Sequence, residues 1–299
     1  MNHHEILDLA TVWVSALAIR EKKFFARSLD SPPIGEVVSE STAALDGFAT
    51  HGEHGVAVNT PVDEFDCGYL VWRWYGDDVP TLIFHHGSGE DPFDFGRFSS
   101  NSVRRLFAND DWADRVNLIA VRAPFHDRSN MAYATSMGQL ADFIGMCAAS
   151  TALVDVLVEH LKDRGSPVAV SGISLGGWVA NLHRAFFETA DQYVPIFAGS
   201  ALGEMFATSV YQRMTGKRAR QRPAQLRSLL DFSEAFADNP TNNCLPLLAR
   251  YDRIIDYEAQ RGCYEGLPLA VIDKGHVTGS LATGAMRDRI RRALDRTVD

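Results

Sequence analysis

Cysteine is scarce in this chain, and its few residues are widely spread. Only four occur among 299 residues, at Cys67, Cys147, Cys244 and Cys263, and none forms a C-x-x-C pair. So few cysteines in so long a chain disfavour a disulfide scaffold, and each thiol is expected to act as a small buried apolar side chain. This usage is typical of a protein from a reducing cytosol.

Positive charge is also in short supply. The chain has 29 lysines and arginines against 38 aspartates and glutamates, which gives a formal net charge of −9. A protein that binds nucleic acid normally carries a basic surface that neutralises phosphates. We therefore expect no nucleic-acid partner.

Long hydrophobic runs are missing as well. The longest run near the N-terminus, from Leu9 to Ile19, is shorter than the ~20 apolar residues that cross a bilayer, and no later run is expected to be long enough. The opening residues, Met1 to Glu5, show neither a basic n-region nor a small-residue cleavage site. The sequence therefore predicts no integral membrane span, no secretory signal and a cytoplasmic location.

What the chain does contain is an ordinary globular composition, 46% hydrophobic and 22% charged. From residue 55 onward, apolar runs alternate with helix-compatible stretches, which predicts an α/β fold: a mostly parallel sheet with helices on both faces. No internal repeat is visible, so one domain with an insertion is the simplest division. The predicted strands are 55–58, 67–75, 81–85, 116–122, 168–171, 193–198, 244–249 and 267–272, and the predicted helices 98–108, 136–164, 175–189, 257–263 and 278–296.

The first 54 residues are predicted to form an N-terminal helical extension, with the main domain over 55–299. Residues 5–28 are expected to be one amphipathic helix, which Ser31-Pro32-Pro33 ends. One interpretation is that this helix packs across the main domain. The other is that it forms a homodimer contact or a membrane-surface anchor. Its apolar positions recur at helical spacing: Ile6, Leu9, Trp13, Leu17 and Phe24.

The chain is organised around the stretch at 168–177, where an apolar run ends in a glycine-rich turn. Gly172-Ile173-Ser174-Leu175-Gly176 fits G-x-S-x-G, the pattern of a nucleophile elbow between a strand and a helix. A side chain in place of either glycine would collide across so sharp a turn, and the turn lifts the Ser174 hydroxyl clear of the sheet. Ser174 is therefore the candidate nucleophile.

A serine nucleophile needs a base that takes its proton and a carboxylate that orients the base. Active groups in parallel sheets lie at the carboxyl ends of strands. That rule selects Asp252, after the strand at 244–249, and His276, after the strand at 267–272. Asp256 is an alternative acid, although its position fits the N-cap of the following helix.

Together these motifs resemble the α/β-hydrolase family over roughly residues 55–296. The resemblance includes His86-Gly87-Ser88-Gly89, which is similar to the family's His-Gly loop after the third strand. In that family, this loop and the residue after the nucleophile each give one backbone N–H to the oxyanion hole. The resemblance therefore implies Ser88 and Leu175 as the donors, and a helical lid insertion at about 203–240.

Further polar residues follow the predicted strands. His85 and His86 are adjacent, so in an extended chain their side chains face opposite ways, which argues against a shared metal ion. Neither a metal nor a cofactor is expected. His86 is a candidate for substrate contact or for bracing the oxyanion loop. His126 and Arg128 are candidates for substrate contact, with an ordinary hydrogen-bonded loop as the alternative.

The predicted insertion carries basic residues inside an acidic chain. They form an ordinary solvated helix face in one interpretation, and attract an anionic substrate or a lipid headgroup in the other. The residues are Arg213, Lys217, Arg218, Arg220, Arg222 and Arg227.

The function expected from these residues is ester hydrolysis through an acyl-enzyme on Ser174, with a small acyl compound as the substrate. A thioesterase or a peptidase with the same residues is an alternative within the enzyme class. A binding protein without catalytic activity is the alternative outside it, because a fold does not fix a function.

Overall fold

The computed structural model describes residues 1–96, 99, 101–108, 116–127, 129–239 and 241–297. Nine strands form one sheet in the order β1-β2-β3-β5-β4-β6-β7-β8-β9. The pairs from β5 to β9 are parallel, and β1, β2 and β3 join them antiparallel at one edge. The strands are β1 Thr42–Ala43, β2 Gly52–Asn59, β3 Glu64–Arg73, β4 Thr81–His85, β5 Asn117–Arg122, β6 Val168–Ile173, β7 Gln192–Ile196, β8 Leu247–Ala249 and β9 Ala270–Ile272.

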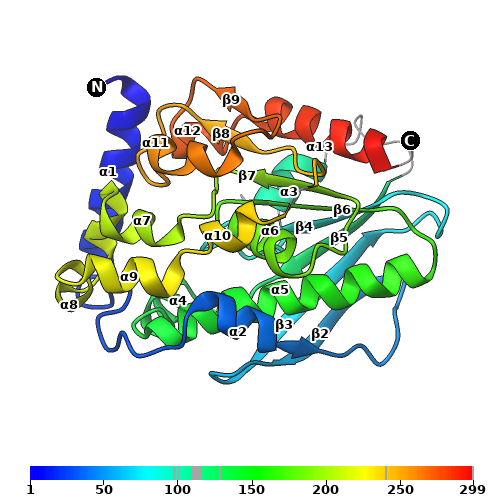
Figure 1. The fold of residues 1–299 in the computed structure, drawn as a ribbon, viewed down its shortest axis with the longest axis horizontal. Coiled ribbons are helices and arrows are strands. Elements are labelled where there is room, and N and C mark those ends of the chain that lie inside the picture. Colours follow the sequence, from blue (N-terminus) through cyan, green and yellow to red (C-terminus); the bar gives the residue numbers. More distant parts are fainter. Residues whose placement is uncertain (97–98, 100, 109–115, 128, 240, 298–299) are drawn as a thin grey trace.

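Helices cover both faces of this sheet, which confirms the predicted α/β class (Figure 1). The α-helices are α1 His3–Ala18, α2 Ile34–Glu40, α3 Ser102–Phe107, α4 Asn130–Ser136, α5 Leu140–Asp163, α6 Leu175–Phe186, α7 Leu202–Ala207, α8 Lys217–Arg220, α9 Pro223–Leu230, α10 Ser233–Ala237, α11 Tyr257–Gln260, α12 His276–Gly279 and α13 Thr283–Thr297. Two 3-10 helices are η1 Val210–Met214 and η2 Arg261–Tyr264.

The central strands are buried on both faces because their side chains alternate between two separate cores. Every residue of β4 and β6 is buried. Ile83 and Val170 belong to the core beneath α5 and α6, whereas Phe84 and Ala169 belong to the core beneath α3 and α13. Continuous apolar strands of this kind are expected in a parallel sheet covered on both faces.

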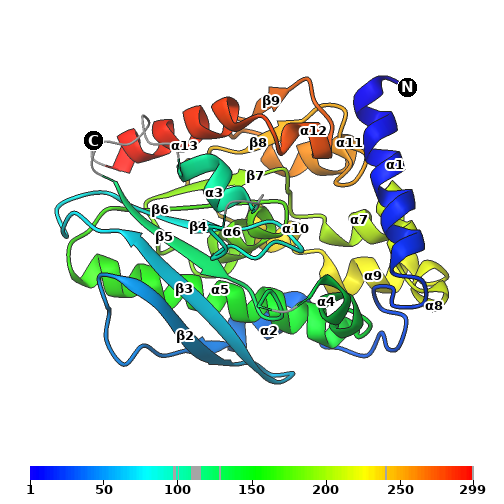
Figure 2. The same cartoon turned by 180° about the vertical axis from the view of Figure 1, so that it is seen from behind.

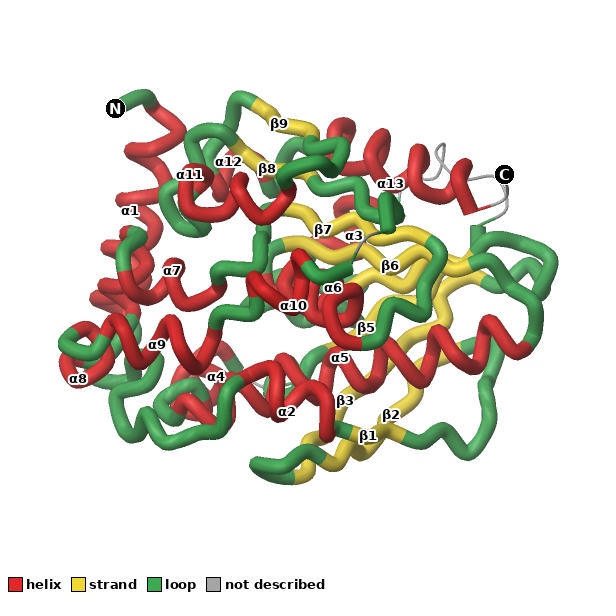
Figure 3. The backbone as a smooth tube through the Cα atoms, viewed as in Figure 1, coloured by secondary structure: helices red, strands yellow, loops and turns green. Residues whose placement is uncertain are grey.

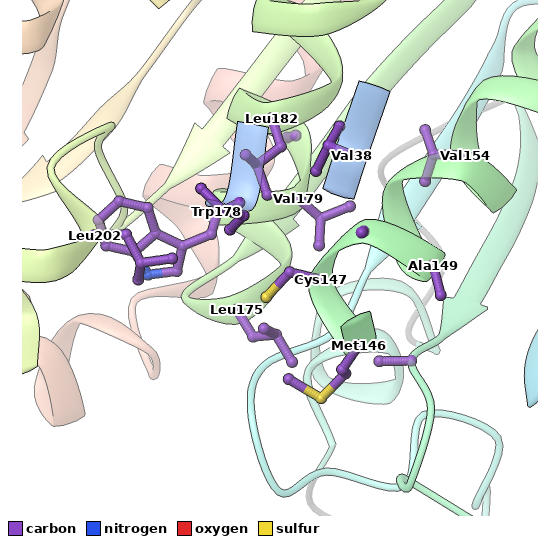
Figure 4. Close-up of a cluster of buried hydrophobic side chains, with 14 of the residues drawn as sticks. Val38, Met146, Cys147, Ala149, Val154, Leu175, Trp178, Val179, Leu182 and Leu202 are labelled. Atoms are coloured by element: carbon purple, nitrogen blue, oxygen red, sulfur yellow. The ribbon is translucent and has the colours of Figure 1, made fainter. Parts of the chain in front are cut away.

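The helix α6, which follows the central strand β6, is held by a dense apolar cluster. Figure 4 shows its side chains Val179 and Leu182 on the side of Val38 of α2 and Cys147 of α5, and the ring of Trp178 beside Leu202 of α7. Trp178 is only 2% exposed, and the others are fully buried. Close packing of this kind fixes the position of the helix start.

Two predicted helices differ from the observed ones. The predicted helix 136–164 is observed as α5, which begins four residues later, at Leu140, because the chain turns at Gly138 after α4, a helix that was not predicted. The predicted helix 5–28 ends at Ala18, and Arg20 beyond it has a φ of 51°, in the left-handed region. The chain then runs without helix to α2, with Phe24 and Phe25 buried in the core.

The residues between β7 and β8 form the predicted insertion as short helices, α7 to α10 and η1, rather than one continuous element (Figure 3). Before residue 55, β1 and the first residues of β2 already belong to the sheet. The division of the chain at residue 55 stays a prediction.

One helix contains an apolar run longer than we expected from the sequence. By length and composition alone, α5 could cross a membrane, and 78% of its apolar window is buried inside the protein. The expectation that no later run would be long enough is therefore wrong for α5. Its apolar surface is used against the sheet and α6.

Candidate active site

The nucleophile candidate lies at a strained turn between β6 and α6. Ser174 has a φ of 54° and a ψ of −108°, a backbone conformation that non-glycine residues rarely adopt. A Cβ on Gly172 would lie 2.4 Å from the carbonyl oxygen of Gly176, and one on Gly176 would lie 2.1 Å from the carbonyl oxygen of His85. The two glycines therefore permit the close approach that the turn requires.

Three side chains from distant parts of the sequence meet at this turn. The Ser174 hydroxyl lies 3.1 Å from Nε2 of His276, and Nδ1 of His276 lies 2.7 Å from Oδ2 of Asp252. With the proton on Nδ1, the imidazole donates to the carboxylate and accepts from the serine. The carboxyl ends of β6, β8 and β9 supply the three residues, as the strand-end rule predicts.

The structure distinguishes the two acid candidates by their hydrogen bonds. Asp252 is 3% exposed, and its Oδ1 accepts from the N–H groups of Ile254 and Ile255 at 2.9 and 2.8 Å. Asp256 instead accepts from two N–H groups at the start of α11, as an N-cap does. Asp252 is therefore the carboxylate in contact with His276.

The charges around His276 favour its protonated form. Burial lowers the pKa of His276, but the carboxylates of Asp252 and Asp8 together outweigh that effect and hold the pKa above its ordinary value of 6.5. Burial raises the pKa of the Asp252 carboxyl, and its hydrogen bond with His276 offsets part of the rise. The imidazole is thus set up to take a proton.

A carboxylate from the N-terminal helix supports the loop that carries His276, and sequence analysis missed it. Asp8 of α1 is fully buried. Its Oδ2 accepts from the N–H groups of His276 at 2.8 Å and Arg253 at 3.1 Å, and its Oδ1 from the N–H of Val277 at 3.0 Å. One side chain therefore joins the loop after β8 to the loop after β9.

Two more contacts strengthen this junction. The ring of His4, one turn before Asp8, hydrogen-bonds to Oγ1 of Thr278 at 2.8 Å. A Cβ on Gly275 would lie 2.8 Å from the Asp8 carboxylate, so the loop at Gly275 has no room for a side chain. In the sequence, His4 and Asp8 stand four residues apart, the spacing that places two side chains on one face of a helix.

The predicted oxyanion donors have free N–H groups. In the described parts of the chain, the backbone N–H groups of Ser88 and Leu175 have no hydrogen-bond partner within the protein. Ser88 and Leu175 line the same cavity as Ser174 and His276. The Ser88 hydroxyl is bonded to the phenol of Tyr133 at 2.7 Å, which fixes the loop to α4.

His86 and His126 hydrogen-bond around the loop that carries Ser88, in keeping with the bracing and hydrogen-bonded-loop alternatives, and their contact with substrate stays a prediction. The His86 ring is fully buried, donates from Nδ1 to the carbonyl of Gly87 and accepts at Nε2 from the N–H of Ala123. His126 accepts at Nε2 from the N–H of Gly89. Burial lowers the pKa of His126 to about 4 and that of His86 well below 6.5, so both rings are neutral near neutral pH.

Arg128, the third candidate for substrate contact, lies outside the described residues. Among those that are described, no group of three or more His, Cys, Asp or Glu side chains is arranged to hold a metal ion.

A cavity of about 330 Å³ opens above Ser174 and His276. Its wall is mainly apolar, with an ion pair between Glu90 and Arg105 at 3.4 Å on one side. Helix α1 and the insertion both contribute to the wall. The principal apolar and aromatic wall residues are Phe24, Tyr133, Phe143, Ile173, Leu175, Trp178, Leu202, Met205, Tyr211, Ile254 and Val277.

Comparisons with known proteins bear on the fold. No family model matches the sequence. No curated protein matches it either. Among solved structures, an esterase of Pyrococcus furiosus is 14% identical, with a TM-score of 0.54, over 90% of this chain and 98% of that one. A cold-adapted esterase from an Arctic intertidal metagenomic library is 13% identical, with a TM-score of 0.50, over 83% of this chain and 96% of that one.

A third solved structure, the acylaminoacyl peptidase of Pyrococcus horikoshii, is 15% identical with a TM-score of 0.50. The match covers 82% of this chain but only 40% of the peptidase, so the two proteins differ greatly in length. With the sheet order and the elbow, these likenesses show that the protein has the α/β-hydrolase fold.

Proposed function

We propose that the protein is a serine hydrolase that cleaves carboxylic esters. The observation that carries this proposal is the unbroken line of hydrogen bonds from Ser174 through His276 to Asp252, at the floor of an apolar cavity. A binding protein has no need for a strained serine in contact with a histidine whose other nitrogen faces a buried carboxylate. The esterases among the structures of similar fold agree with this choice.

In the proposed mechanism, His276 takes the proton of the Ser174 hydroxyl as its oxygen attacks the carbonyl carbon of the ester. Asp252 holds the ring with Nδ1 protonated and stabilises the imidazolium that forms. His276 then gives the proton to the departing alcohol, which leaves an acyl-enzyme on Ser174. Water activated by the same imidazole releases the acid and restores the serine.

The tetrahedral intermediates carry a negative oxygen, for which the free N–H groups of Ser88 and Leu175 are the proposed donors. Each such donor is worth about 3 kcal/mol of barrier lowering. The loop that carries Ser88 is held by hydrogen bonds with His86, His126 and Tyr133. The two N–H donors therefore need little rearrangement during the reaction. This rigidity is what makes an oxyanion site effective.

The cavity indicates the class of ester. Its volume lies near the lower end of the ~300–1,000 Å³ of ligand pockets, and its wall is mainly apolar. We infer an ester with a compact apolar acyl group. An ester is preferred to an amide because an alkoxide is expelled more easily than an amine.

Labelling with a fluorophosphonate probe, together with the hydrolysis rate of p-nitrophenyl butyrate, tests the proposal. We expect the wild type to be labelled and the Ser174→Ala variant to lose both labelling and at least about 10⁴-fold in kcat. Ser39→Ala, at an exposed serine of α2, is the matched control and keeps both properties. A folded wild-type protein that reacts with neither compound would favour the binding-protein alternative.

A further inference from the structure

Helix α1 buries a mainly polar face against the protein and exposes its apolar face. Its inner face is polar: His4 and Asp8 are buried there, together with Val12. Its outer face carries a continuous apolar stripe, which we call the outer stripe and which consists of Ile6, Leu7, Ala10, Trp13, Val14 and Leu17. Of the two interpretations of this helix, packing across the main domain would turn the apolar positions inward, whereas the structure turns Ile6, Trp13 and Leu17 to the solvent.

The exposure of the outer stripe is large. The exposed fractions are 53% for Ile6, 47% for Trp13, 68% for Val14 and 70% for Leu17. Single exposed apolar residues are common on protein surfaces, but a row of them along one helix marks an interaction surface. The stripe contains no charged side chain, so nothing on it opposes contact with an apolar partner.

Cations gather at the C-terminal end of the stripe. The Arg213 guanidinium lies 4.0 Å from the centre of the Trp13 ring, and Nζ of Lys23 donates to the carbonyl of Arg213 at 3.0 Å. Figures 1 and 2 show α8 beside this end of α1 from both sides. We call the following residues the basic cluster: Arg20, Lys22, Lys23, Arg213, Lys217, Arg218, Arg220 and Arg222.

The basic cluster is segregated from the rest of the charge. Within residues 19–23 and 208–222, Glu21 is the only acidic residue, although the whole chain has a net charge of −9. Seven of the eight cations are exposed, and Lys23 is half-buried. An apolar stripe that ends in concentrated positive charge is the pattern of a helix that lies at a membrane surface.

We propose that α1 docks the protein on an anionic lipid surface, with the outer stripe in the interfacial layer and the basic cluster against the headgroups. The helix has 16 residues. It is therefore about 24 Å long, too short to cross a bilayer but suited to lie in its plane. Trp13 is the residue of the outer stripe that contacts the basic cluster, through Arg213. An amphipathic indole ring is favoured at the boundary between an apolar and a polar layer.

Charge complementarity favours a lipid surface over a second copy of this chain. A second copy that paired stripe against stripe would cover the apolar residues, but α1 brings no free carboxylate to the basic cluster. Asp8 is buried, and Glu5 is bonded to the N–H of Asn2 in the helix cap. An anionic membrane supplies both an apolar layer and negative charge.

The docked orientation places the cavity beside the membrane. Thr11, on the flank of the outer stripe, lines the cavity together with Val277 and His276. The helix that carries the docking face therefore also forms part of the cavity wall. The docking proposal does not depend on the proposed hydrolysis, because lipid binding is measured without substrate.

Vesicle flotation with the full chain tests the proposal. We expect binding to vesicles of phosphatidylcholine with about 30% phosphatidylserine, and weak binding to phosphatidylcholine alone. Binding should fall as salt is raised, because the cluster acts through exposed charges. The double variant Val14→Ser/Leu17→Ser should lower the partition coefficient at least about tenfold. Tyr75→Ser, which removes an exposed aromatic residue outside α1, should leave it unchanged.

A second variant keeps the test decisive if the stripe variant folds poorly. Arg218→Glu/Arg220→Glu changes a different element and should also reduce binding to the anionic vesicles at least about tenfold. Vesicle binding that neither variant affects would overturn the proposal, as would the absence of binding to either vesicle. Dimerisation in ultracentrifugation that is lost in Val14→Ser/Leu17→Ser, without vesicle binding, would assign the stripe to a second copy instead.

Discussion

The imidazole of His276 controls the pH range in which the proposed reaction runs. As a general base it works only when neutral, and its pKa lies above 6.5 because Asp252 and Asp8 outweigh the effect of burial. Activity is therefore full above that pKa and is lost as the pH falls through it. We expect the acid limb of kcat/KM, measured with p-nitrophenyl butyrate, to have its midpoint above 6.5. A midpoint clearly below 6.5 would contradict this account of the charges.

Asp8 acts on the same imidazole through charge and through position. In Asp8→Asn the negative charge is lost, so the acid-limb midpoint should move to lower pH. The amide nitrogen cannot accept the N–H bonds that the second carboxylate oxygen accepts, so the His276 loop should loosen and kcat should fall about tenfold with little change in KM. The pH profile and the two constants are measured with the same ester.

Asp273→Asn is the matched control for this variant. It removes one negative charge three residues before His276, but the Asp273 side chain is 72% exposed and is paired with Arg250. Screening by solvent should leave the pH midpoint nearly unchanged. Equal shifts in the two variants would mean that Asp8 has no special position, and an unchanged midpoint in Asp8→Asn would leave it a purely structural residue.

The sequence identified the residues that follow strands better than those that support them. Ser174 follows from the elbow pattern and Asp252 and His276 from the strand-end rule, and the structure brings the three together. Asp8 lies more than 240 residues from the N–H groups that it accepts, so no local pattern points to it. The roles given to His86 and His126 depended on exposure, which a sequence does not reveal.

At the scale of the element, the elbow has no room for a side chain at Gly176. In Gly176→Ala the added methyl group would meet the backbone of His85 at the end of β4, which cannot move without disturbing the sheet centre. Overpacking of this kind typically costs about 1–3 kcal/mol. We expect a lower urea midpoint and loss of fluorophosphonate labelling. Gly284→Ala in α13, where a Cβ meets nothing within 4 Å, should leave the midpoint unchanged or slightly raised.

The elements predicted best are those whose pattern of apolar residues is compatible with only one arrangement in the fold. Strands β4 and β6 are short and mainly apolar, with no alternation of polar residues, so burial on both faces is the arrangement that suits them. For helix α1 the sequence left two interpretations open, and the structure turns Ile6, Trp13 and Leu17 to the solvent rather than to the core. Periodicity shows that a helix has two faces, but the surroundings decide which one is buried.

At the scale of the molecule, the candidate site combines residues from near the N-terminus, from the middle of the sequence and from near the C-terminus. Asp8 lies in the first helix, Ser174 follows the central strand, and His276 precedes the last helix. The helices differ greatly in how many of their residues are buried. The core helix α5 has sixteen buried residues, whereas α1 has three, which are His4, Asp8 and Val12. The site is therefore only as stable as its least buried element.

This inequality predicts the order of events in urea. Phe24 and Phe25 are buried, and their N–H groups donate to the carbonyls of Met214 and Met137. They should keep the chain after α1 attached to the core. We therefore expect α1 to detach from the loops after β8 and β9 at a lower urea concentration than that at which the sheet unfolds. Detachment frees the His276 loop, so fluorophosphonate labelling should be lost before far-UV circular dichroism changes. Coincident transitions would show that α1 unfolds together with the core, and that its few polar contacts hold it as firmly as apolar packing holds α5.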